Sequence, residues 1–187
     1  MALTKARRSL PPLDQARLQE LALRYVGKYS TTRAKLRIYL SNKLRQRGWN
    51  GEREPDLEAL AERFSELGYV DDAAYAASKS RALSGRGYGR RRLVEKLKLA
   101  GVGEEDCKEA LETAERESLN AALRYAERRR IGPFASEVPD RPAREKAIAA
   151  MVRAGHGFGI SRAIASLDPG ADVDPINLCE SSRYDGA

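Results

Sequence analysis

The chain has 187 residues, of which 42% are apolar, 33% charged and 6% aromatic, with a formal net charge of +7 at pH 7. This length suffices for one ordinary domain or a short array of small repeats. So few aromatic residues disfavour long strands, whereas abundant Leu, Ala, Arg, Glu and Lys favour helices. The basic excess promotes encounter with polyanions or acidic protein surfaces, but a surface of scattered solvated cations explains it equally well.

The two cysteines, Cys107 and Cys179, are far apart and lack CxxC spacing, which excludes a disulfide framework or a zinc site built on them. Cys107 shares a helical face with small apolar residues and is expected in the core. The sequence has no run of about 18 apolar residues and no apolar signal-type block at its N-terminus. We therefore expect a cytoplasmic protein that does not contact a membrane.

The first predicted elements follow a basic arm. Residues 1–12 are basic and have no hydrophobic periodicity, which predicts a mobile segment. A helix is predicted to begin near Asp14, whose carboxylate can accept hydrogen bonds from first-turn amides, and to reach Val26. Ser30 is expected to cap a second helix, which runs toward Gly48.

The next helices have similar start and stop signals. A third helix is predicted to open at residues 54–56, with the proline in its first turn, and to end at Gly68. Asp71 is expected to cap a fourth helix, which ends in the glycine-arginine loop 84–87. A fifth helix is predicted to end at Gly101.

The remaining predicted helices occupy the C-terminal half. A sixth begins near the acidic residues 104–106, which complement the positive end of a helix. A seventh ends at residues 132–133, an eighth extends from Asp140 to Gly155, and a short ninth ends at residues 169–170. Beyond it the chain is polar and lacks periodicity, which predicts disorder.

An internal repeat organises these elements. Leu23-Arg24-Tyr25 recurs as Leu123-Arg124-Tyr125, and Tyr75 lies midway between the two tyrosines. The glycines at the same point of each cycle are Gly48, Gly101 and Gly155. A period of roughly 50 residues with three helices per cycle is typical of a tandem helical array. An irregular helical bundle with chance similarity is the alternative.

The sequence therefore predicts an all-α fold, an elongated tandem array of three three-helix repeats that resemble helix-turn-helix units. The predicted segments are a flexible basic arm (1–12), repeats at 13–68, 69–116 and 117–168, and a disordered tail (169–187).

Asp71 and Asp72 form the most distinctive acidic pair. Paired carboxylates can bind a divalent metal or share a proton. Adjacent carboxylates at the start of a helix, however, usually act as a cap and a dipole partner, and no further ligand follows at suitable spacing. We therefore expect a structural pair, with Tyr69 and Val70 as a hydrophobic hinge between the first two repeats.

Two basic regions are candidate contact surfaces. In residues 84–92, glycines alternate with arginines, so backbone amides and guanidinium groups can approach phosphate, although a solvated face is almost as plausible. The second predicted helix is also basic, and Ile38 and Trp49 lie off its leucine stripe. Because a helix that is apolar on two sides is usually sandwiched, Trp49 is expected to serve packing first and ligand contact second.

Catalytic patterns are missing from the sequence. The sole histidine, His156, lies just past a predicted helix end and is not accompanied by a recognisable nucleophile motif or metal-ligand set. We therefore expect a binding protein rather than an enzyme, with no cofactor, no metal and no small-molecule substrate.

Several segments of the chain resemble the RecX regulatory proteins, and they occur in the same order as in that family. The central signature of that family resembles residues 68–76, Arg81, residues 87–89 and the helix that ends at Gly101. The family's flanking units resemble residues 29–40 and 151–158, so that the resemblance covers roughly residues 15–168. Lys35, Ala100 and His156 depart from the family's usual residues.

The resemblance implies tandem three-helix units in an elongated, curved molecule. It also implies binding to the recombinase RecA, along the groove of its filament on DNA. There, RecX proteins modulate and usually inhibit ATP hydrolysis and strand exchange, which tunes recombination and the SOS response. Some members also bind DNA. No catalytic residues or cofactors are implied.

Our leading hypothesis is a monomeric RecA modulator. Its candidate RecA or DNA contacts are Arg33, Arg37, Arg45, Arg86, Tyr88, Arg90, Arg91, Lys98 and Arg128. Its structural motif comprises Gly68, Tyr69, Asp71, Asp72, Tyr75 and Gly101. The alternatives are a nucleic-acid-binding protein that acts without RecA, and a helical scaffold for another protein.

Overall fold

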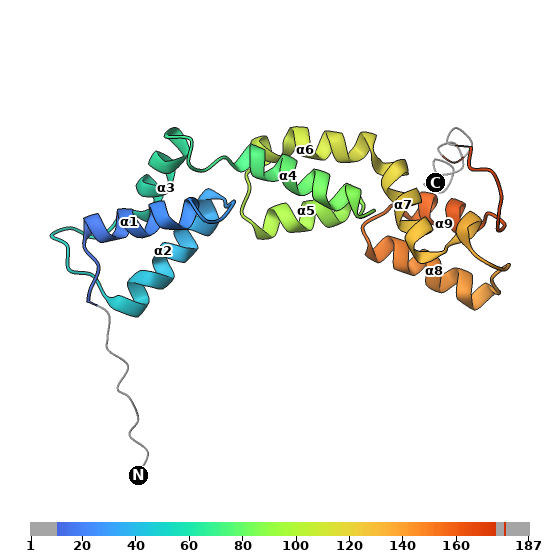
Figure 1. Ribbon diagram of the computed structural model, residues 1–187, viewed down its shortest axis with the longest axis horizontal. Helices are drawn as coiled ribbons and strands as arrows, with labels where there is room; N and C mark the ends of the chain where they lie inside the picture. Colours follow the sequence, from blue (N-terminus) through green and yellow to red (C-terminus); the bar gives the residue numbers. More distant parts are fainter. Residues whose placement is uncertain (1–10, 175–177, 179–187) are drawn as a thin grey trace, which may run out of the picture. The chain divides into compact units, whose positions relative to one another are not determined.

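The computed structural model describes residues 11–174 and residue 178 (Figure 1). Over these residues the chain is all-helical, as predicted, and strand-like pairing is limited to one isolated bridge between Leu13 and Trp49. The helices are α1 (Gln15–Val26), α2 (Arg33–Arg47), α3 (Leu57–Glu66), α4 (Asp72–Gly85), α5 (Arg90–Leu99), α6 (Glu104–Arg116), α7 (Ser118–Arg129), the short 3-10 helix η1 (Gly132–Phe134), α8 (Arg141–Arg153) and α9 (Phe158–Ala165).

These helices form three successive groups of three, which confirms the tandem organisation expected from the repeat. None of the described helices has the length and apolarity that a membrane span requires. The predicted arm over residues 1–10 and most of the predicted tail, including Cys179, lie outside the described residues. The boundaries of the repeats and the elongated form of the array stay predictions.

Side-chain caps set most of the helix starts. The Asp14 carboxylate accepts a hydrogen bond from the Arg17 amide at 2.9 Å, as predicted for α1. The prediction for α2 was wrong, because Thr32 rather than Ser30 is its cap. Asp56 caps α3, so the preceding proline lies before the helix and not in its first turn.

The chain divides into two compact units, and the first comprises residues 11–75 and 100–102 among those described. Its core is centred on α2, where Leu36 and Leu40 are fully buried. Trp49 packs against this core and its indole N–H donates to the Arg53 carbonyl at 2.8 Å, in line with the expected packing role. Ile38 is 60% exposed, so the expectation that α2 is sandwiched on two sides was wrong.

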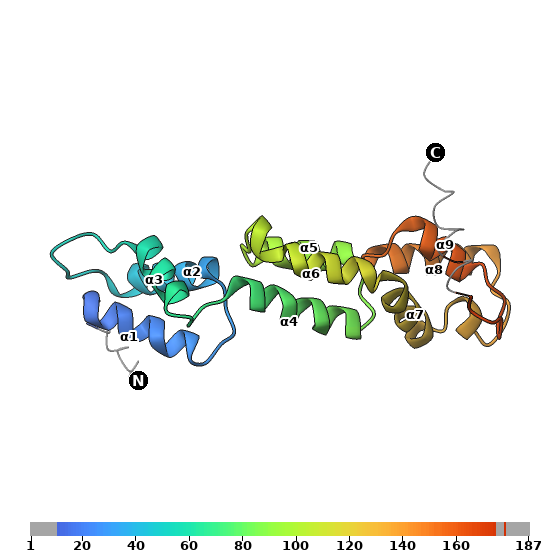
Figure 2. The ribbon, with the colours of Figure 1, turned by 90° about the horizontal axis from the view of Figure 1, so that it is seen from above.

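The second unit comprises residues 76–99, 103–174 and 178 among those described. Its core gathers α7, α8 and α9 around buried residues such as Met151 and Ile164, and Figure 2 shows α4 alongside α5 and α6. Cys107 is only half-buried, which corrects the core position predicted for it. Leu178 is buried in this core.

A glycine turn in the first unit allows the backbone to approach closely. Gly101 ends the turn after α5 with a φ of 68°. A Cβ atom at this position would lie 2.4 Å from the Cβ atom of Ala34, in the first turn of α2. Beside it, the Thr32 hydroxyl donates to the Ala100 carbonyl at 2.6 Å. The start of α2 therefore docks on this turn with no space for a side chain between them.

The second unit contains a glycine turn of the same kind. Gly155 ends the turn after α8 with a φ of 99°, and a Cβ atom there would lie 2.5 Å from the Arg92 backbone nitrogen. The Gly89 amide donates to the Ala154 carbonyl at 3.0 Å. Gly48, the equivalent glycine of the first repeat, also has a positive φ, but its Cβ position is open. The predicted helix-ending glycines are thus confirmed, and two of them also form docking surfaces.

We expect Gly101→Ala to destabilise the first unit more than Gly68→Ala. Both glycines have positive φ, which costs an alanine about 1–2 kcal/mol. Only Gly101 meets a neighbour, and such overpacking adds about 1–3 kcal/mol. The free energy of unfolding can be measured with urea by following the fluorescence of Trp49, the only tryptophan.

Ala34→Gly supplies the control, because it removes the Cβ atom that an alanine at position 101 would meet. In a double-mutant cycle, Ala34→Gly should recover part of the stability that Gly101→Ala loses. Purely additive losses would contradict the docking explanation.

His156 is a buried polar group of the second unit. The side chain is 2% exposed, and its Nε2 atom donates to the Gly87 carbonyl at 3.0 Å. Burial lowers the pKa of His156 below its ordinary value of 6.5 and outweighs the opposing effect of the Gly87 hydrogen bond. The sequence did not indicate this role.

Stability should therefore fall as the pH drops through the range below about 6.5. In that range the unfolded chain binds a proton at position 156 whereas the folded chain does not, so acid favours unfolding. His156→Gln keeps an N–H donor for Gly87 and removes the titration. Urea unfolding at pH 7 and pH 5 should show a larger loss for the parent than for the variant. Equal losses would show that His156 is not held neutral.

Candidate functional site

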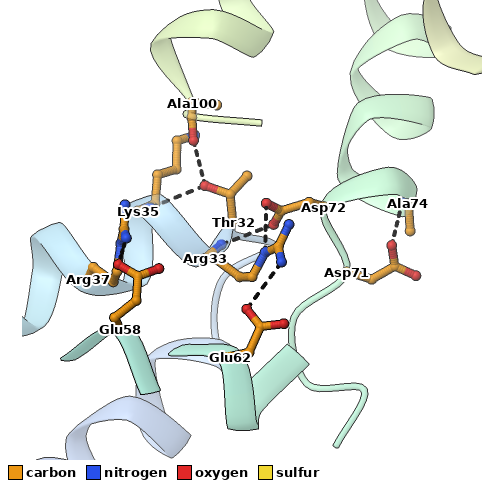
Figure 3. Close-up of polar contacts among 10 residues, drawn as sticks. All are labelled: Thr32, Arg33, Lys35, Arg37, Glu58, Glu62, Asp71, Asp72, Ala74 and Ala100. Atoms are coloured by element: carbon orange, nitrogen blue, oxygen red, sulfur yellow. Dashed lines mark hydrogen bonds and ion pairs between the residues drawn. The ribbon is translucent and has the colours of Figure 1, made fainter. Parts of the chain in front are cut away.

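The two adjacent carboxylates of the central motif act on different helices (Figure 3). Asp71 accepts a hydrogen bond from the Ala74 amide at 2.7 Å and so caps α4, as predicted. Asp72 lies in the first turn of α4 but points to α2, where it accepts from the Arg33 backbone amide at 3.0 Å and from the Arg33 Nε atom at 3.4 Å. The expectation that both carboxylates serve their own helix is therefore corrected.

This arrangement makes the motif a structural one within the first unit. Asp72 is 5% exposed, so its charge is neutralised by groups of α2 rather than by solvent. No cluster of three potential metal ligands occurs among the described residues. Asp71 therefore caps α4, whereas Asp72 secures the start of α2.

Other motif residues also face inward. Tyr75 is buried, and the ammonium group of Lys35 donates to its hydroxyl and lies 4.6 Å from its ring centroid. Gly68 ends α3 with a φ of 75°. Val70 belongs to the first core, and the exposed Tyr69 ring lies 5.6 Å from the Phe64 ring. The hinge role predicted for residues 69 and 70 stays a prediction.

Several predicted contact residues are engaged in ion pairs within the protein. Arg33 pairs with Asp72 and with Glu62, whose carboxylate lies 3.2 Å from its Nη1 atom. Arg37 pairs with Glu58. The exposed Arg90 pairs with Glu115 at 3.3 Å. These guanidinium groups would have to leave an internal carboxylate before they could bind a partner, which makes them weaker candidates than unpaired cations.

The other predicted cations are more accessible. Arg45 is exposed and bonds to the Asn42 amide oxygen. Arg86, Arg91 and Lys98 are exposed, and none of the three forms an ion pair with a described residue. Arg91 and Lys98 are seven residues apart on α5, which places them on the same side of that helix. We refer to Arg91 and Lys98, together with Arg86 in the turn before α5, as the α5 face.

Tyr88 and Arg128, the remaining predicted contacts, lie in a pocket of about 640 Å³ in the second unit. Its polar and aromatic lining residues are Tyr88, Arg92, Tyr125, Arg128, Arg129 and Arg153, and we call it the tyrosine–arginine pocket. Among its described lining residues there is no carboxylate. Four arginines therefore line one cavity.

Sequence reasoning missed most of this pocket. The sequence has basic runs at residues 90–92 and 128–130, but these lie on separate helices. Arg153 was part of the segment 151–158 that resembles the family, but nothing in the sequence linked it to a cavity. The recurrence of Leu-Arg-Tyr marked Tyr125 as part of the repeat, although not as part of a cavity. Only the packing of α7 and α8 beside the start of α5 brings these groups together.

Comparisons with known proteins agree with this architecture. The family model described as RecX, second three-helix domain, matches residues 71–111. The chain is 32% identical over 160 residues to Regulatory protein RecX of Myxococcus xanthus, covering 81% of this chain and 86% of that relative. It is 35% identical over 142 residues to Regulatory protein RecX of Pseudomonas putida strain KT2440, covering 74% and 83%.

Solved structures show the same fold. The crystal structure of RecX from Lactobacillus salivarius matches with a TM-score of 0.62 and 18% identity over 80% of this chain and 92% of that chain. A second crystal structure of a regulatory protein RecX matches with a TM-score of 0.59, 22% identity and coverage of 77% and 68%. The identity to the curated relatives, which extends over most of both chains, shows that this chain belongs to the RecX family of regulatory proteins.

Proposed function

We propose that this protein binds the RecA filament on DNA in the cytoplasm and lowers its ATP hydrolysis and strand exchange, which restrains recombination and the SOS response. The single observation that carries the proposal is the 32% identity to a RecX regulator over 86% of that relative's length. The protein acts by binding and catalyses no reaction of its own.

The α5 face supports a contact with such a filament. Arg86, Arg91 and Lys98 are exposed and unpaired among the described residues, so binding does not require an internal ion pair to break. A nucleoprotein filament presents DNA phosphates and acidic protein side chains, and both attract guanidinium and ammonium groups. The net charge of +7 speeds the encounter at low ionic strength.

Inhibition follows if one molecule contacts neighbouring RecA protomers. Hydrolysis of ATP in a filament is accompanied by movement of the subunits, and a ligand that binds one arrangement more tightly shifts the population toward it. A modulator that bridges two protomers would thus slow turnover without touching the nucleotide. The modulator would thus regulate ATP hydrolysis through its binding energy, without catalysing a reaction.

The purified protein should lower the DNA-dependent ATPase rate of RecA filaments, with a weaker effect as salt screens the basic face. ATP hydrolysis can be measured with single-stranded DNA and RecA held constant while this protein is titrated. An unchanged rate at saturating concentration would contradict the proposal. Tight binding to bare DNA with no binding to filaments would favour the alternative, a nucleic-acid-binding protein that acts without RecA.

Charge reversal should identify the contact face. We expect Arg86→Glu/Arg91→Glu/Lys98→Glu to need about tenfold more protein for half-maximal inhibition, because like charges then oppose docking. Lys108→Glu/Arg116→Glu/Lys146→Glu is the matched control, since it also changes three exposed cations and lowers the net charge from +7 to +1. Equal losses in both variants would show that net charge, not the α5 face, is responsible.

A further inference from the structure

The tyrosine–arginine pocket is lined by four arginines and by no carboxylate. No lining residue therefore balances their positive charge. Arg92, Arg128, Arg129 and Arg153 border the same cavity of about 640 Å³. Arg92 pairs with Glu95 outside the lining, and no ion pair with a described residue is formed by the other three. The guanidinium cations around this cavity repel one another, and a bound anion would relieve that repulsion.

Helix ends account for part of this cluster but not for its convergence. Arg129 is the last residue of α7 and Arg153 the last of α8, where cations are favoured by the helix dipole. That effect explains one cation on each helix. It does not explain why α5, α7 and α8 direct their arginines into one cavity without a carboxylate.

Two tyrosine rings hold part of the cluster in place. The Arg128 guanidinium carbon lies 5.7 Å from the Tyr88 ring centroid and 5.5 Å from that of Tyr125, and Arg129 lies 6.0 Å from the Tyr125 ring. Tyr125 is buried, and its hydroxyl donates to the Ala150 carbonyl at 3.3 Å. Cation–π contacts with a fixed ring restrict the guanidinium groups before any ligand arrives, which lowers the entropic cost of binding.

The same contacts indicate which part of a ligand the pocket takes. Each of the two rings already has a guanidinium group over it, which leaves less ring surface on which a base could stack. Each of the four guanidinium groups instead offers paired N–H donors that an oxyanion can accept from. A single carboxylate can use one such fork, whereas a phosphate group offers several oxygens and, as a polyphosphate or a chain of diesters, several charges.

We propose that the tyrosine–arginine pocket binds phosphate groups in the absence of RecA. The phosphate comes either from the backbone of single-stranded DNA or from a free nucleoside triphosphate. This binding is independent of the proposed action on RecA, and its residues are distinct from those of the α5 face.

The test measures anisotropy of a fluorescent oligothymidylate titrated with the full-length protein without RecA, over a series of salt concentrations. Arg128→Gln/Arg153→Gln should weaken binding by about tenfold or more, because two charge-assisted contacts are lost. The slope of log affinity against log salt should also fall by about 1.4, since each single-strand phosphate contact contributes about 0.7.

Two further variants separate site binding from charge and folding. Arg116→Gln/Arg141→Gln removes the same charge from exposed positions outside the pocket and should bind like the parent. Arg92→Gln/Arg153→Gln leaves the stacked Arg128 and Arg129 in place, so weaker binding there cannot come from lost ring packing. Unchanged thermal melting of helical circular dichroism verifies folding.

Competitors distinguish the sources of phosphate. Displacement of the oligonucleotide by ATP or pyrophosphate assigns the pocket to free polyphosphates, and its failure to displace assigns the pocket to the DNA backbone; both outcomes support the proposal. Displacement by polyglutamate as effective as that by DNA would overturn it, as would equal losses in the pocket and control variants or no binding of any phosphate probe. Loss of RecA inhibition would leave this result unaffected.

Discussion

At Gly101 and again at Gly155, a turn with positive φ brings the backbone so near to the start of another helix that no side chain fits between them. In each case a carbonyl beside the glycine accepts a hydrogen bond from the docked segment, from the Thr32 hydroxyl or from the Gly89 amide. Such contacts fix distance and register more tightly than apolar packing alone. Each compact unit contains one such glycine turn, so the two units share a close backbone contact as well as a helical pattern.

Buried polar groups make these joints specific. Near Gly101, the Asp72 carboxylate binds both the backbone and the side chain of Arg33. Near Gly155, the buried polar group is the neutral imidazole ring of His156, which donates to the Gly87 carbonyl. A buried carboxylate or imidazole is costly unless its partners are in place, so misdocked arrangements are penalised. The leucine and alanine cores supply attraction, and these polar contacts select one geometry.

The arginines have three different physical roles, which cannot be told from the net charge alone. Arg33 and Arg37 neutralise carboxylates within the first unit. Arg86 and Arg91 extend from the surface and are suited to long-range attraction. Those of the tyrosine–arginine pocket border one cavity, and Arg128 and Arg129 lie against its tyrosine rings. Arginine can therefore serve in internal ion pairs, in long-range attraction of a partner and in a binding site within one protein.

Local sequence signals determined the helical class, the order of the elements, the caps at Asp14 and Asp71 and the glycine stops, because propensity, capping and positive φ depend on neighbours along the chain. The family was also visible in the central motif, which the comparisons confirm. Only the tertiary structure assigned Asp72 to α2, placed Cys107 outside the core and grouped Arg92 with Arg128 and Arg153. The physical reason is that these relations join helices far apart in sequence, where side-chain direction and desolvation depend on packing that no local pattern encodes.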